Sequence, residues 1–177
     1  MNPKTKTVVL GLVFMLLLLF AYFENGTFFG VVGDVFSNAP LAVFYLFVHN
    51  VLVVSLILLG MTFYVGLVFN FMPERKIEYV VINNPRVFAF VFSLMILFLS
   101  ILRASMLVYG QILVNTLFLV ILLSTPVAVI EGYGIYQTIK KTLQRKMTTK
   151  SLALIYLIFF VAAIIEVGFV YLLRAIV

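Results

Sequence analysis

The sequence contains no cysteine and no tryptophan, a single histidine, and only 10% charged residues. The absence of cysteine excludes a disulfide framework, a thiolate nucleophile and a cysteine-ligated metal site. Metalloprotease (HExxH) and nucleophile-elbow (G-x-S-x-G) motifs are also missing, so we expect a protein that is not an enzyme and holds no cofactor.

What the chain has in abundance is apolar side chains, at 65% of 177 residues. A soluble domain of this size carries roughly 45–50% apolar and about 25% charged residues. A soluble fold could not bury so much apolar surface. The twelve basic residues are spread among apolar runs, which argues against nucleic-acid binding. The composition predicts an all-α integral membrane protein in contact with membrane lipids.

Apolar runs long enough to cross a hydrocarbon core of about 30 Å recur along the chain. Between the first two runs, glycines, Asn38 and Pro40 interrupt a stretch that is otherwise apolar, which predicts a short interfacial or re-entrant element over 25–48. The prediction is one polytopic domain over 1–177, with five transmembrane helices at about 7–23, 50–71, 87–108, 111–137 and 151–173. A tight turn at Gly110 would make the third and fourth helices a hairpin.

Basic residues set the predicted orientation. With the N-terminus in the cytoplasm, ten of the twelve fall in inner segments, as the positive-inside rule requires. These are Lys4, Lys6, Arg75, Lys76, Arg86, Lys140, Lys141, Arg145, Lys146 and Lys150. We therefore expect a multi-pass cell-membrane protein with a cytoplasmic N-terminus and an external C-terminus.

Ionisable residues at membrane depth are costly and need a partner or a function. Helical rise puts Arg103 and Glu166 about 25 Å and about 24 Å above the inner boundary. Their matching depth and opposite charge predict a pair, either structural or on a substrate path. Arg103 reaching alone to the outer headgroups is the other interpretation.

Glu131 has no cation at its depth of about 13 Å, whereas Tyr64 lies at about 12 Å. Because burial disfavours the charged form, we expect Glu131 to be neutral at pH 7 and hydrogen-bonded within the bundle, with Tyr64 as a candidate partner. A proton relay or cation site and a plain interhelical hydrogen bond are the two alternatives.

His49 and Asn50 fall about 34 Å above the predicted inner boundary, at the outer interface. A histidine there could be a pH sensor or a metal ligand. Without a second histidine or a cysteine a metal site lacks ligands, and Asn50 capping the second span is the simpler interpretation. In that span Gly60 and Gly66 indicate close helix contacts.

The segments Phe47–Val53 and Gly60–Gly66, followed by Asn70, resemble the second-span pattern of the stage II sporulation protein M family. Pro126 with Glu131 five residues later is similar to that family's Pro-His-Gly-x-x-Glu stretch, although Val127 and Ala128 replace the His-Gly pair. The resemblance implies a divergent member with five or six spans that acts with partner proteins.

The leading hypothesis is therefore a non-enzymatic scaffold or subunit of a membrane complex, acting with other membrane proteins or by self-association. The alternative is a small transporter or channel subunit that uses an intramembrane carboxylate, Glu131 above all. Stable copurifying partners would favour the first function, and pH- or ion-dependent flux would favour the second.

Overall fold

The computed structural model describes residues 2–72, 79–109 and 117–176, apart from the side chains of some helical positions, Arg103 among them. Every element in these ranges is a helix. The elements are α1 (Pro3–Val35), α2 (Ala39–Phe71), α3 (Tyr79–Asn83), α4 (Pro85–Tyr109), α5 (Leu117–Leu143) and α6 (Thr149–Ile176).

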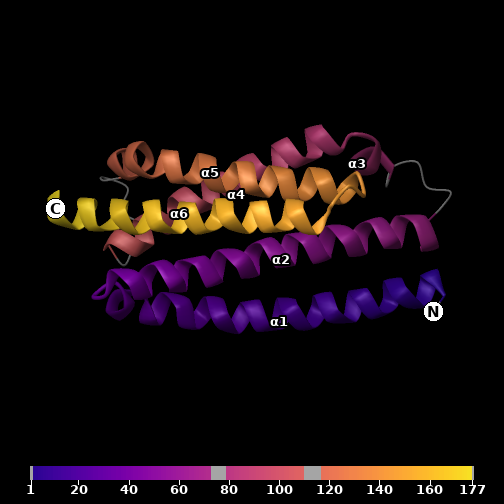
Figure 1. The fold of residues 1–177 in the computed structure, drawn as a ribbon, viewed down its shortest axis with the longest axis horizontal. Helices are drawn as coiled ribbons and strands as arrows, with labels where there is room; N and C mark the ends of the chain where they lie inside the picture. Colours follow the sequence, from indigo (N-terminus) through magenta and orange to yellow (C-terminus); the bar gives the residue numbers. More distant parts are fainter. Residues whose placement is uncertain (1, 73–78, 110–116, 177) are drawn as a thin grey trace.

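The five long helices lie side by side along one axis (Figure 1). Helix α2 is central: it packs against α1 on one side and against α5 and α6 on the other, while α4 packs mainly on α5. In Figure 1, α2 runs obliquely between α1 and the α4–α6 layer, and its C-terminal end extends beyond the α5–α6 turn. The two termini lie at opposite ends of the bundle.

Within the part of the chain that the structure describes, three helical segments are long and apolar enough to cross a membrane: Pro3–Phe28, Ala39–Phe71 and Thr149–Leu172. A shorter apolar segment, Pro85–Ser100, lies at the start of α4. The all-α class and the membrane character predicted from the sequence are confirmed by these segments. Five spans stay a prediction, and the predicted turn at Gly110 lies outside the described residues.

The interfacial element predicted over 25–48 does not form a separate element, and the break within that range is limited to 36–38. Helix α1 continues through Glu24 and the following glycines to Val35, and α2 begins at Ala39. Each glycine costs roughly 1 kcal/mol in a helix, but Phe28, Val35 and Phe36 are buried against α2 and α6, and this apolar burial offsets the cost. The chain turns instead at Asn38, whose side-chain oxygen accepts a hydrogen bond from the Leu41 amide and caps α2.

Helices α1 and α2 approach closely because a glycine on each helix leaves room for an aromatic ring of the other. A Cβ built on Gly11 would lie 2.7 Å from the Phe63 ring, and one on Gly60 would lie 2.9 Å from the Phe14 ring. Near the N-terminus, a Cβ on Gly66 would lie 2.9 Å from Thr7 Oγ1. The close contacts expected at Gly60 and Gly66 are therefore confirmed, and α1 is the helix that makes them.

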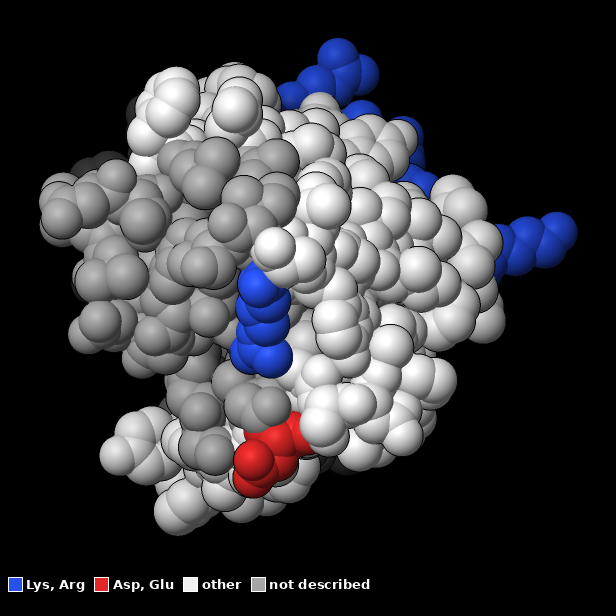
Figure 2. Space-filling model, turned by 90° about the vertical axis from the view of Figure 1, so that its left-hand side faces the viewer, with Lys and Arg blue, Asp and Glu red and all other residues white. Residues whose placement is uncertain are grey.

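The described residues of the predicted inner basic segments lie at one end of the bundle (Figure 1), where α1 begins, α2 ends and α5 turns into α6, whereas Arg75 and Lys76 lie outside the described residues. Figure 2 looks onto the opposite end, which is mostly uncharged over the part that is described. Two exposed charged residues lie close to that end: Asp34, just before the α1–α2 turn, and Arg174, near the C-terminus. Charge is thus distributed asymmetrically along the bundle axis.

Gly134 in α5 provides a test of this packing. A Cβ there would lie 2.6 Å from the Phe159 ring, which is only 2% exposed and cannot move aside freely. We expect Gly134→Ala to lower the free energy of unfolding by about 1–3 kcal/mol. Thermal unfolding in detergent, followed by circular dichroism, measures it.

Gly168→Ala in α6 is the matched control, since a Cβ there meets nothing within 4 Å. Helix propensity predicts that this change stabilises the protein by up to about 1 kcal/mol. If the two substitutions gave the same change in unfolding temperature, the packing of α5 against α6 would not be as described.

Candidate functional site

A cavity of about 320 Å³ lies in the interior of the bundle, and all five long helices contribute to its lining. Most of the lining is apolar, from residues such as Leu52, Ile96 and Phe159. Five polar side chains converge on it: Glu24 of α1, His49 and Asn50 of α2, Ser100 of α4 and Glu131 of α5. An apolar cavity with a few convergent polar groups is the usual form of a small-ligand site.

Glu131 is the central polar group of this cavity and is only 4% exposed. Its Oε1 accepts a hydrogen bond from Asn50 Nδ2 at 3.0 Å. Its Oε2 accepts one from Ser100 Oγ at 2.6 Å. One carboxyl group thus joins α2, α4 and α5, because each of its oxygens is held by a donor from a different helix.

The donors around Glu131 suit either protonation state of the carboxyl. An ionised carboxylate only accepts hydrogen bonds, and Asn50 and Ser100 both donate to it. A protonated carboxyl must also donate one. The Ser100 hydroxyl can then turn to accept, and the Asn50 amide carries a carbonyl oxygen as well as its NH₂ group.

The second polar pair is formed by His49 and Glu24. His49 Nδ1 lies 3.0 Å from Glu24 Oε1 and 3.1 Å from Oε2, with the side chains 9% and 17% exposed. Because a carboxylate accepts, the proton on Nδ1 donates to Glu24 in this arrangement. The His49 ring also stacks on Phe28, with 4.3 Å between the ring centroids, so that its position is fixed from two sides.

The described lining therefore contains two carboxyl groups and one imidazole. Each ionised group within a low-dielectric bundle is costly, so the hydrogen bonds of these side chains matter to their stability. Within the described residues, no three His, Cys, Asp or Glu side chains form a group that could hold a metal ion.

Asn50 does not have its predicted role. It is not the cap of α2, which is Asn38; Asn50 is buried well inside the helix and donates to Glu131. The predicted depths were about 34 Å for Asn50 and about 13 Å for Glu131. The difference between these depths is wrong, because the two side chains are hydrogen-bonded and therefore lie at the same level. The two counts started at different levels, because α2 extends beyond the α5–α6 turn and leans across the bundle (Figure 1).

The other predicted polar residues are not in the described cavity lining. Tyr64 is half-buried and packs against a separate apolar cluster around Val54, Ile135 and Ile139, and the described donors to Glu131 are Asn50 and Ser100. Glu166 is buried on α6. The predicted Arg103–Glu166 pair is untested, because the Arg103 side chain lies outside the described residues.

Two residues of the site, Glu24 and Ser100, are missed by the sequence analysis. Glu24 looks like the polar end of a seventeen-residue span, although the run of Phe28, Val31, Val32 and Val35 after it signals that the helix continues. Ser100 carries no charge and has no recognisable spacing, so nothing in the sequence singles it out.

Comparisons with protein-family models, with curated proteins and with solved structures found no match. The resemblance to the stage II sporulation protein M family accordingly stays a prediction.

The hydrogen bond between Asn50 and Glu131 can be measured with a double-mutant cycle. We expect Asn50→Ala and Glu131→Ala each to destabilise the protein, and the double variant to lose less than the sum, with a coupling of about 0.5–3 kcal/mol. Removing one partner leaves the other buried without that bond. Thermal unfolding in detergent gives the four free energies.

The control cycle replaces Asn50 and Thr142, which lies at the far end of α5 and donates to the Thr138 carbonyl oxygen. These two changes should be additive within about 0.5 kcal/mol. Additive losses for Asn50 and Glu131 as well would contradict the contact.

Proposed function

We propose that this chain is a non-enzymatic, multi-pass membrane protein that binds a proton in its interior cavity, as a small transporter or channel subunit. The observation that carries the proposal is the Glu131 carboxyl group, which is 4% exposed, is hydrogen-bonded to two other helices and lines a cavity that Glu24 and His49 also line. Ionisable side chains inside a membrane-spanning bundle commonly belong to proton relays or ion paths.

Glu131 is the group we assign to proton binding. Glu131 is more deeply buried than Glu24, and its described hydrogen bonds come from Asn50 and Ser100, two side chains that can also accept. When a proton binds to Oε2, the Ser100 hydroxyl changes from donor to acceptor. Protonation is thereby linked to the contacts between α5 and both α2 and α4, and such a link is what a proton-coupled cycle requires.

The size of the cavity supports a small ion over a large solute. Its volume of about 320 Å³ corresponds to about ten water molecules at roughly 30 Å³ each. This is room for the waters that a proton path needs, and it is near the lower limit of ligand pockets, about 300 Å³.

Proton flux into proteoliposomes tests the proposal. With a potassium diffusion potential as the driving force and a pH-sensitive dye inside the vesicles, the native protein should acidify the lumen. Glu131→Gln should reduce the rate at least tenfold while the protein stays folded, because glutamine keeps the size and the hydrogen bonding but cannot bind the proton.

Glu166→Gln is the matched control, since Glu166 is also a buried carboxyl, 5% exposed against 4% for Glu131, but is outside the described lining. It should keep the flux. Equal flux for native protein and Glu131→Gln would contradict the proposal, and a sodium gradient in place of the proton gradient identifies a sodium site. The infrared carboxyl band that Glu131→Gln removes reports whether the acid is protonated at pH 7, as the sequence predicts.

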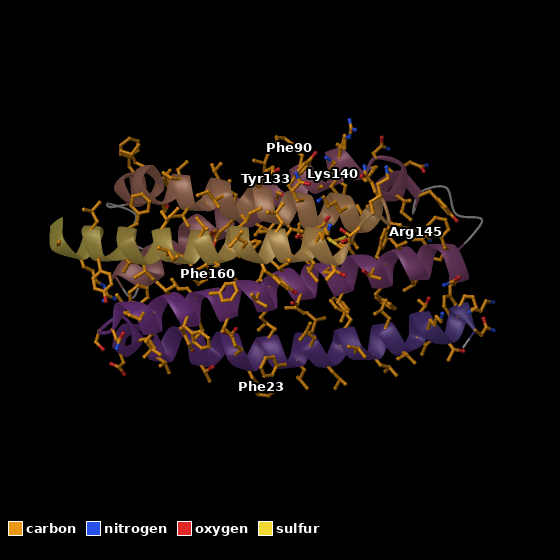
Figure 3. The ribbon with its side chains drawn as sticks, in the orientation of Figure 1. Phe23, Phe90, Tyr133, Lys140, Arg145 and Phe160 are labelled. Atoms are coloured by element: carbon orange, nitrogen blue, oxygen red, sulfur yellow. The ribbon has the colours of Figure 1, made fainter. Side chains whose placement is uncertain are left out.

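A scaffold or subunit role in a larger membrane complex is the second candidate. Helix α1 packs mainly on α2, so its opposite face is a row of exposed apolar side chains. Phe23 points away from the bundle in Figure 3, and Leu12, Met15, Leu16, Leu19 and Phe20 are also exposed. Lipid or a partner helix could cover this row, and stable copurification of another membrane protein together with an absence of flux would favour the scaffold.

The orientation that we propose has the N-terminus and the basic end in the cytoplasm and the C-terminus outside. Single cysteines can be introduced without background because the native chain has none. Thr148 in the α5–α6 turn and Ser37 between α1 and α2 are both exposed. In intact cells an impermeant thiol reagent should label Ser37→Cys and should label Thr148→Cys only after lysis. The reverse pattern would invert the orientation.

A further inference from the structure

A second cavity, of about 430 Å³, lies at the basic end of the bundle and is distinct from the site around Glu131. Its walls are the start of α1, the last turns of α2, and the end of α5 with the α5–α6 turn. Two cationic side chains, Lys6 and Arg145, line it from opposite elements, together with Thr62, Asn70, Leu10 and Val65. We call this cavity the basic groove.

The lining of the basic groove is suited to bind an amphipathic anion. Lys6 and Arg145 supply positive charge. The hydroxyl groups of Thr7, Thr62 and Thr142 donate to carbonyl oxygens of their own helices, and Asn70 donates to Thr7, so the two cations are the groups left to bind an anion. The described lining includes no carboxylate. Leu10 and Val65 add an apolar portion, so that one molecule with an anionic head and an apolar tail would satisfy both parts.

The backbone of Arg145 has a conformation that is unfavourable for any residue with a side chain. Its φ of 56° is left-handed. The Lys146 amide donates to the Lys141 carbonyl oxygen and the Arg145 amide donates to that of Thr142, which is the Schellman pattern that ends a helix and normally takes glycine here. A left-handed non-glycine residue costs about 1 kcal/mol or more. Such a residue persists where its side chain has a function.

The side chain of Arg145 is also held in place. Its guanidinium carbon lies 4.0 Å from the centroid of the Phe69 ring on α2, a cation–π contact. Figure 3 shows Arg145 at the end of the bundle where the α5–α6 turn faces α2. This contact leaves the planar edge of the guanidinium, which carries the N–H donors, available to bind an anion.

The opposite wall of the groove is fixed as well. Asn70 Nδ2 donates to Thr7 Oγ1 at 2.8 Å, which ties the start of α1 to the end of α2. Lys4 lies 5.8 Å from the centroid of the Phe71 ring. The backbone that carries Lys6 is therefore already fixed against α2, so that little conformational entropy is lost there when an anion binds.

The level of the groove along the bundle identifies the anion. All three candidate spans have an end here: α1 begins at Pro3, the second segment ends at Phe71, and the third begins at Thr149. We place the phospholipid phosphates at this level because the three candidate spans begin or end here. Basic pockets between helices at such a boundary bind anionic headgroups.

We infer that the basic groove is a binding site for one anionic phospholipid, whose phosphate lies between Lys6 and Arg145 and whose acyl chain packs along Leu10 and Val65. A zwitterionic lipid binds more weakly because its ammonium group faces the same two cations. This inference depends only on the membrane character of the chain. It holds or fails independently of proton binding at Glu131.

Native mass spectrometry of the detergent-purified protein tests the site. The probes are phosphatidylglycerol and phosphatidylethanolamine with identical acyl chains, titrated together. The native protein should retain one phosphatidylglycerol in preference to phosphatidylethanolamine. Removal of each cation should weaken phosphatidylglycerol binding about fivefold, and Lys6→Ala combined with Arg145→Gly should abolish the preference.

Arg145→Gly is suited to this test because glycine prefers the left-handed backbone. The unfolding temperature should therefore stay the same or rise while lipid binding falls. Arg145→Asn, which also tolerates this conformation, is the second variant should glycine loosen the turn. A loss of lipid accompanied by unfolding in both variants would overturn the inference.

Lys146→Ala/Lys150→Ala is the charge-matched control, since both lysines are exposed at the same end and neither is in the described lining. It should keep the lipid preference. An equal loss of the preference in the control would show that general surface charge causes it, and would overturn the inference of a specific site. Displacement of the lipid by millimolar inorganic phosphate would show a free-phosphate site and overturn the assignment to lipid.

Discussion

The constraint on which this structure depends is the need to satisfy buried polar groups where water is absent. Glu131 meets it with donors from two other helices, Asn50 of α2 and Ser100 of α4. The contact joins three helices by hydrogen bonds, and apolar packing alone does not distinguish a lipid tail from a leucine. The same carboxyl therefore contributes to how the helices assemble and is the group to which we assign proton binding.

The two cavities differ in the ionisable side chains that line them. The described lining of the first has the carboxyl groups of Glu24 and Glu131 with the imidazole of His49, whereas that of the basic groove has Lys6 and Arg145 and no carboxylate. Helix α2 lines both, with Asn50 in one and Asn70 in the other. An asparagine can donate and accept, so each is suited to its own surroundings without adding a charge.

Composition alone was enough to predict an all-α membrane protein, because the fraction of apolar residues leaves no other way to bury the chain. The site was predicted only in part. Glu131, His49 and Asn50 stood out as polar residues in apolar runs, but their partners depended on how the helices align, and α2 is offset from the α5–α6 turn. Helical rise measures distance along one helix and contains no information on that offset. Ser100, a neutral residue, could not be found without the structure.

The reciprocal contacts of α1 and α2 have a mechanical consequence. Gly11 receives the ring of Phe63, and Gly60 receives the ring of Phe14, so each helix both inserts a ring and accepts one. Sliding either helix by a turn would move both rings away from their glycines and onto positions that carry a side chain. These two contacts therefore tie α1 and α2 into one unit. A change in the shape of the cavity that kept both contacts would have to alter the packing of this pair against α4, α5 and α6.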